Sequence, residues 1–149
     1  ILITNGSRVH VEGVQAGLRA MAAARGQVWF KLDRATAAGR LEVNRVQGGT
    51  ERAADQLALA ASLCPTRVQT CMYTVDGEPP AEGELAAYVD FLRAQVHAGT
   101  DLDGVTLYGL ARPSMQPGAE RLGRVSAPWL EALAERVRGA TELSVAVHP

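Results

Sequence analysis

Short stretches of alternating apolar and polar residues are separated by longer stretches in which apolar residues recur every three to four positions. The alternation predicts strands and the longer repeat predicts helices. The predicted strands are Ile1–Thr4, Val28–Asp33, Arg67–Thr74, Val105–Leu110 and Leu143–Val147. The predicted helices are Val11–Arg25, Thr50–Leu63, a helix from Pro79-Pro80 to about Ala98, and one from Ser126 to Gly139. Strict alternation of the two kinds of element predicts an α/β fold with a parallel sheet.

The predicted connections are short from helix to strand and long from strand to helix. The long ones are Arg34–Gly49, Val75–Pro80 and Ala111–Val125. All of them therefore lie beyond the carboxyl ends of the strands, where parallel α/β folds bind ligands. Arg34–Gly49 spans sixteen residues, a length typical of functional or disordered segments, and we expect it to be a loop over the site.

One face of the strand Val28–Asp33 is apolar, whereas the other ends in Lys31 and Asp33, and Lys31 is the only lysine of the chain. The corresponding polar positions elsewhere are Asn5, Gln69 with Tyr73, and Thr106 with Tyr108. A sheet covered by helices on both faces needs apolar residues on both. The one-sided polarity instead predicts a complete or incomplete barrel with a polar lumen and helices on its outer face only.

Composition narrows the class of protein further. The 149 residues correspond to a single domain, and the net charge of −1 gives no basic patch for nucleic acid or an anionic membrane. No apolar run is long enough to span a membrane and no signal peptide is visible, so we expect a cytoplasmic protein. Cys64 and Cys71 lack the spacing of metal ligands and are interpreted as buried free thiols.

Several short motifs, in this order, resemble the later part of the (β/α)6 barrel of the radical S-adenosylmethionine enzymes, in particular an iron–sulfur oxidoreductase branch. They are Ile3-Thr4-Asn5-Gly6, Lys31-Leu32-Asp33, Asn44-Arg45, Gln69-Thr70, and Tyr108 through Arg112-Pro113. Val46 departs from the pattern, since the family often has proline there. The similarity covers nearly the whole chain, and it implies that residues 1–149 are the later βα units of such a barrel.

The family's CxxxCxxC cluster motif and GGE motif are absent from the sequence. The resemblance therefore implies a partial barrel, a fragment that lacks the cluster-binding front part and is inactive alone. It further implies that this chain holds no cofactor, whereas the full-length protein holds S-adenosylmethionine and a 4Fe–4S cluster. Two distant cysteines cannot ligate such a cluster.

The resemblance also assigns roles to individual residues. It implies cofactor contacts for Asn5, Lys31, Asp33, Gln69 and Tyr108, and substrate contacts for Asn44, Arg45 and Arg112. Purely structural roles are the alternative. Lys31 and Asp33 can form an internal ion pair, Asn5 can form a turn, and the Gln69 amide can hydrogen-bond neighbouring backbone. Asn44, Arg45 and Arg112 can be ordinary loop residues.

Two functions follow as hypotheses. The first is a fragment of a radical S-adenosylmethionine enzyme that acts on a small-molecule substrate in the intact protein. The alternative is a free-standing α/β domain that binds an anionic small molecule or a partner protein. If the front units are absent, Ile1–Thr4 is an open sheet edge, which predicts a homodimer through that edge.

Overall fold

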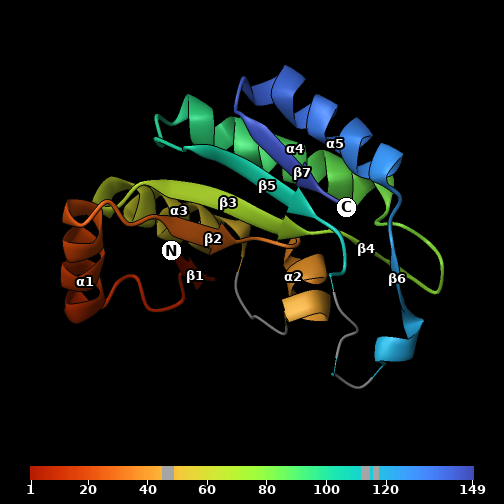
Figure 1. Cartoon of the computed structure of the whole chain (residues 1–149), viewed down its shortest axis with the longest axis horizontal. Helices are drawn as coiled ribbons and strands as arrows, with labels where there is room; N and C mark the ends of the chain where they lie inside the picture. Colours follow the sequence, from red (N-terminus) through yellow and green to blue (C-terminus); the bar gives the residue numbers. More distant parts are fainter. Residues whose placement is uncertain (45–48, 112–114, 116–117) are drawn as a thin grey trace.

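The computed structural model describes residues 1–44, 49–111, 115 and 118–149, with Asn44 described by its backbone alone. Its main sheet has five strands in the order β1-β2-β3-β5-β7, and every neighbouring pair is parallel (Figure 1). The strands are β1 (Leu2–Thr4), β2 (Val28–Lys31), β3 (Thr66–Cys71), β5 (Gly104–Tyr108) and β7 (Val145–His148). The predicted parallel sheet in sequential order is confirmed.

Four helices form a single layer on one face of this sheet (Figure 1). They are α1 (Glu12–Ala23), α3 (Thr50–Leu63), α4 (Glu82–His97) and α5 (Ala127–Thr141). The strand residues beneath this layer are fully buried, among them Val28, Phe30, Val68, Val105 and Leu107. In the described part of the chain the sheet is open, with β1 and β7 at its edges. This arrangement is the partial barrel that the sequence predicts, with helices on the outer face only.

The ends of two helices follow from local chemistry. Ser126 precedes α5, and its Oγ accepts a hydrogen bond from the N–H of Trp129 at 3.3 Å, which confirms the predicted cap. Helix α4 begins at Glu82, and not at Pro79-Pro80 as predicted. A residue before proline avoids helical dihedrals, so Pro79 cannot open a helix that continues through Pro80, and the extended Ala81 precedes the first turn.

The sequence prediction was wrong about the first long loop and about the end of one strand. Arg34–Gly49 was expected to be a loop, but it contains helix α2 (Ala37–Asn44). The predicted strand Arg67–Thr74 is divided at Met72, after which β4 (Tyr73–Val75) leaves the main sheet and pairs antiparallel with β6 (Leu122–Arg124). A short 3-10 helix, Ala119–Arg121, precedes β6. These short elements lack enough residues for a periodic pattern to show.

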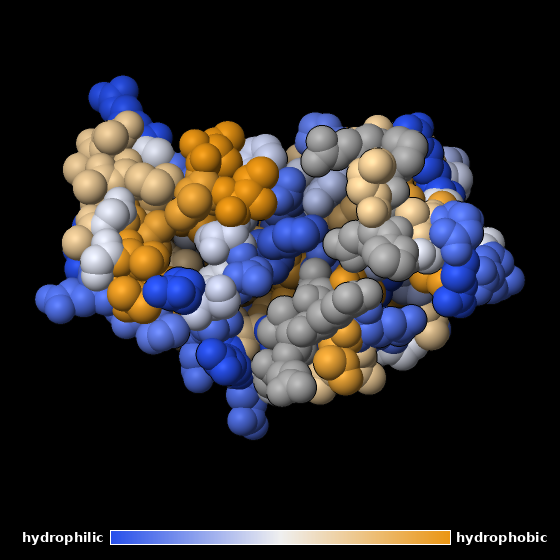
Figure 2. Space-filling model, turned by 90° about the horizontal axis from the view of Figure 1, so that it is seen from below, coloured by the Kyte–Doolittle hydropathy of each residue, from blue (hydrophilic) through white to orange (hydrophobic). Residues whose placement is uncertain are grey.

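Strand β1 is an exposed edge of the sheet. Ile1 is 75% exposed and Ile3 is 55% exposed, so an apolar strip lies beside the unpaired backbone of this strand. Figure 2, which looks at the molecule from below, shows apolar atoms gathered in its left half, where β1 lies. No helix in the described part of the chain is long and apolar enough to cross a membrane.

The close contact between β5 and the start of β7 generates a stability prediction. Gly104 has φ +130°, and a Cβ there would meet the backbone oxygen of Ser144 at 2.5 Å. We expect Gly104→Ala to lower the free energy of unfolding by about 2–4 kcal/mol in urea denaturation, because both strain and overlap are introduced. Gly17→Ala is the matched control: its Cβ meets nothing within 4 Å on α1, so we expect a gain of about 0.5–1 kcal/mol. A Gly104→Ala protein with the same free energy of unfolding as wild type would contradict this close contact between Gly104 and Ser144.

Candidate functional site

Two rows of side chains cross the face of the sheet that the helix layer does not cover. The strand register aligns Lys31 with Gln69, and Gln69 with Thr106. One step nearer the carboxyl edge, Cys71 is aligned with Tyr108, and Asp33 joins this row through a hydrogen bond to the backbone of Cys71. Because side chains on a strand alternate in direction, Lys31, Gln69 and Tyr108 share one face, as the sequence predicts.

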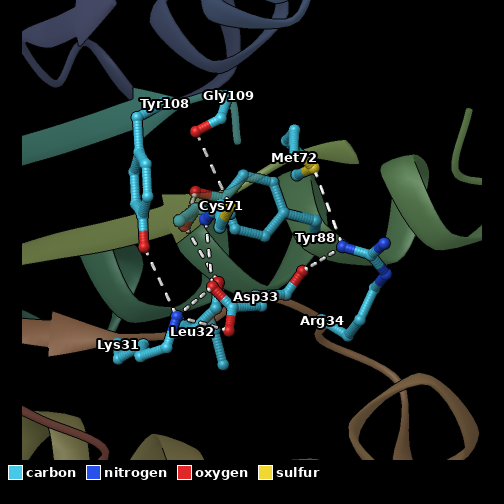
Figure 3. A network of polar contacts seen from close by, with 10 residues as sticks. Lys31, Leu32, Asp33, Arg34, Cys71, Met72, Tyr88, Tyr108 and Gly109 are labelled. Atoms are coloured by element: carbon cyan, nitrogen blue, oxygen red, sulfur yellow. Dashed lines mark hydrogen bonds and ion pairs between the residues drawn. The ribbon is translucent and has the colours of Figure 1, made fainter. Parts of the chain in front are cut away.

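Asp33 is the centre of a polar network (Figure 3). Its side chain is 3% exposed, and Lys31 Nζ donates to it at 2.9 Å on Oδ1 and 2.7 Å on Oδ2. The backbone N–H of Cys71 donates to Oδ1 at 3.0 Å. Lys31 also donates to the hydroxyl of Tyr108 at 3.4 Å. The network thus joins three strands through one buried carboxylate.

These contacts determine the protonation of the two partly exposed titratable groups of the network, Lys31 and Tyr108. Burial alone lowers the pKa of Lys31, but the carboxylate of Asp33 and the Tyr108 hydroxyl outweigh it, so the pKa of Lys31 is raised. Lys31 is therefore an ammonium ion at neutral pH, which excludes a neutral amine that forms a Schiff base. Burial raises the pKa of Tyr108, and its phenol stays protonated as a hydrogen-bond donor or acceptor.

The two cysteines are free and buried, as predicted. Burial raises the pKa of both thiols, and Cys71 Sγ lies 3.9 Å from the carbonyl oxygen of Gly109. They lie near opposite ends of β3, Cys64 before its first residue and Cys71 at its last. Among the described residues, no group of three or more His, Cys, Asp or Glu side chains has the arrangement of a metal site. The side chains described here do not fit a 4Fe–4S cluster, which needs thiolate ligands.

The remaining candidate residues lie in different places. Asn5 Oδ1 accepts a hydrogen bond from the N–H of Ser7 at 3.0 Å, which is a turn interaction, and no contact with Lys31 is found among the described residues. Gln69 is half-buried in the row beside Lys31. Asn44 ends helix α2, but its side chain, like all of Arg45 and Arg112, lies outside the part of the chain that the structure describes. The ligand roles of all these residues stay predictions.

Two further residues lie beside this network, Arg34 and Glu84, and no sequence pattern indicates them. Arg34 is 6% exposed, donates from Nη1 to the carbonyl oxygen of Asp33 at 2.7 Å, and lies 4.8 Å from the centroid of the Tyr73 ring. Glu84 accepts hydrogen bonds from the N–H groups of Ala35 and Thr36. An acidic residue in the first turn of a helix normally indicates only a dipole interaction, so this long-range contact could not be predicted.

Comparison with solved structures found a radical SAM methyltransferase from Sphaerobacter thermophilus, with a TM-score of 0.60 and 15% sequence identity. The similarity covers 98% of this chain and 39% of that protein, so the chain spans well under half of its length. At this identity the likeness is one of fold. No protein-family model matches the chain, and the search of curated proteins gave no match.

The ion pair generates a prediction about the pH dependence of stability. We expect Lys31→Met to lower the free energy of unfolding by about 1–3 kcal/mol near neutral pH, since the ion pair of Lys31 with the buried Asp33 is lost while the site keeps some contact with water. The pKa of Lys31 is raised above 10.5 in the folded protein, so its stabilisation is complete below that pH and is lost as the pH rises through the folded value.

The measurement is urea unfolding of wild type and Lys31→Met from neutral to strongly alkaline pH. The difference between them should narrow only above about pH 10.5. Arg93→Met serves as the control, because Arg93 forms an exposed pair with Asp90, and its removal should have little effect at any pH. If the loss of unfolding free energy in Lys31→Met stayed the same at every pH, the charge of Lys31 would not stabilise the fold through Asp33.

Proposed function

We propose that this chain forms the later βα units of a radical S-adenosylmethionine enzyme and contributes one wall of its cofactor and substrate site. The observation that carries the proposal is the open polar face of the sheet, where Lys31 and Tyr108 meet at the carboxyl edge. The shared fold with a radical SAM methyltransferase supports it. The activity belongs to the intact protein, and the small-molecule substrate is not specified by these residues.

Lys31, Gln69 and Tyr108 supply the chemistry that S-adenosylmethionine needs from a binding wall. The Lys31 ammonium binds the carboxylate of the cofactor, while the Gln69 amide and Tyr108 hydroxyl bind hydroxyl or amino groups. When bound, the cofactor supplies a sulfonium centre with activated carbon–sulfur bonds. Asp33 acts indirectly, because it keeps Lys31 charged and turned toward this face. Asn44, Arg45 and Arg112 remain proposed substrate contacts.

The 4Fe–4S cluster is not assigned to this chain, because the described cysteines do not fit it. The role proposed for residues 1–149 is binding and orientation, and the 149-residue chain alone should not be an active enzyme. Thiolate ligands for the cluster must come from outside the described residues.

A second candidate function, binding of a partner protein, is favoured by the bare edge of β1. An apolar strand with unpaired backbone groups is a template for another strand. Ile1 and Ile3 are exposed beside that edge. A second copy of this chain satisfies the same requirement, so we propose a homodimer through β1 for the 149-residue chain.

The cofactor proposal is tested by titrating S-adenosylmethionine into the chain by NMR. We expect weak binding, on the order of millimolar, because one wall buries only part of the ligand. Lys31→Met should weaken it about tenfold, through the loss of a charge-assisted hydrogen bond.

Arg67→Met is the matched control for this titration, since Arg67 lies on the same face but at the amino end of β3, where it donates to the carbonyl oxygen of Asp103. Its removal should leave the affinity unchanged. Thermal unfolding of each variant is measured in parallel. Unchanged affinity of Lys31→Met together with a large loss of stability would reduce Lys31 to a structural ion-pair partner.

The edge proposal is tested by sedimentation velocity. We expect the wild-type chain to self-associate and Ile3→Lys to shift it to monomers, because a lysine on an edge strand disfavours pairing. Leu41→Lys is the control, since Leu41 is comparably exposed on α2, away from this edge. A wild-type chain that stays monomeric at high concentration would argue against the homodimer.

A further inference from the structure

A hollow of about 510 Å³ lies on the side of Asp33 and Arg34 away from Lys31, between α2, the β4–β6 ribbon and the start of α4. Its charged lining residues are Arg34, Glu42, Glu78, Glu84 and Arg121. Apolar parts of the wall come from Ala38, Val43, Val75, Pro79, Pro80 and Leu122. The volume is that of a site for a small organic molecule. None of these residues belongs to the Lys31 network on the open face.

Arg34 carries a buried positive charge into this hollow. Nη1 is occupied by the Asp33 carbonyl and by Met72 Sδ at 3.9 Å, and the guanidinium lies over the ring of Tyr73. Figure 3 shows the other guanidinium nitrogens directed away from these two acceptors. Among the described residues Arg34 has no carboxylate partner within ion-pair distance. A buried cation normally has such a partner. No buried side-chain nitrogen in the described part of the chain lacks a hydrogen bond, so the remaining nitrogens of Arg34 are open to the hollow, where an anion can reach them.

The other charges of the hollow decide which anion fits. The Glu84 carboxylate accepts three hydrogen bonds, from the N–H groups of Ala35 and Thr36 and from the Thr36 hydroxyl. Arg121 is paired with Asp76 through three hydrogen bonds. Glu42 and Glu78 are exposed at the mouth and have no ion pair with any described residue. Among the described lining residues, Arg34 is therefore a cation without an ion pair, and Glu42, Glu78 and Glu84 are carboxylates without one. Glu84 is held in place by its hydrogen bonds, whereas Glu42 and Glu78 are exposed at the entrance.

We propose that this hollow binds a zwitterionic small molecule whose carboxylate pairs with Arg34 and whose amino group faces Glu42 and Glu78. The fork of a guanidinium matches the two oxygens of a carboxylate, and stacking on Tyr73 holds its plane in place. A dianion is disfavoured by the acidic mouth, and an amine alone leaves Arg34 unpaired. The apolar wall accepts the chain that connects the two charged groups. This site goes beyond the cofactor role proposed above and shares no residue with it.

The test uses four probes with the same six-carbon chain: ε-aminocaproate, caproate, adipate and hexylamine, each titrated by NMR into the 149-residue protein. We expect ε-aminocaproate to bind most tightly, caproate more weakly, and the other two least. Arg34→Gln should weaken ε-aminocaproate at least about tenfold, since a charged hydrogen-bond donor is lost. The double variant Glu42→Gln/Glu78→Gln should remove the preference for ε-aminocaproate over caproate. Arg93→Gln, at an exposed pair elsewhere, should change nothing.

Because Arg34 is buried, thermal unfolding is used to check that Arg34→Gln still folds. Ala38→Phe is a second variant, which blocks the hollow without changing Arg34. Ala38 is exposed and lines the hollow, so a larger side chain fills the site without touching the core. Loss of binding in both variants supports the site. No binding to wild type, or full binding to a folded Arg34→Gln, overturns it. Competition by S-adenosylmethionine also overturns it, since the hollow would then be part of the cofactor site. Failure of the cofactor titration alone leaves this result unaffected.

Discussion

The buried carboxylate of Asp33 is the constraint on which the carboxyl edge of this sheet depends. A charge that is 3% exposed must be paired and hydrogen-bonded, and Lys31 and the backbone of Cys71 supply both requirements. Lys31 is the last residue of β2 and Asp33 follows it by two positions, so the two side chains leave the chain on the same side and can pair. The bond to Cys71 then fixes the end of β2 against β3. Through the same carboxylate, Lys31 is held where its ammonium group reaches the hydroxyl of Tyr108 on β5.

The alternation of a strand also explains why two separate polar sites meet here. Asp33 and Arg34 are consecutive, and their side chains leave the backbone in opposite directions. Asp33 turns toward the open face and Lys31, whereas Arg34 turns toward Tyr73 and the hollow beneath α2. The carbonyl of Asp33, which accepts from Arg34, is the only link between the two sites among the contacts described here. One strand end therefore presents a cation to each side of the sheet.

Much of the fold could be predicted from periodicity, because each long helix and buried strand repeats its apolar residues over many positions. Helix α3 has the predicted bounds, and the polar positions Lys31, Gln69 and Tyr108 fall on one face, as expected. The short elements could not be predicted, since α2 and the β4–β6 ribbon are held by distant partners. The candidate site was only partly predictable for the same reason. Alternation shows which face a residue takes, but not that Arg34 would be buried with no ion-pair partner among the residues that the structure describes.

Glu84 shows how such distant contacts position α2, which forms one wall of the hollow. Its carboxylate receives the N–H groups of Ala35 and Thr36, and Thr36 in turn caps α2 by accepting from the N–H of Gly39. A Cβ at Gly39 would meet Glu84 Oε2 at 2.8 Å, so the close approach of α2 to α4 requires a glycine there. Two residues of the preceding segment, Ala35 and Thr36, together with Gly39 of α2 and Glu84 of α4, thus determine where α2 lies. The same contacts hold Glu84 at the segment before α2, and among the described residues its carboxylate forms no ion pair with Arg34. The contacts that position α2 therefore also determine which charges of the hollow can meet a ligand.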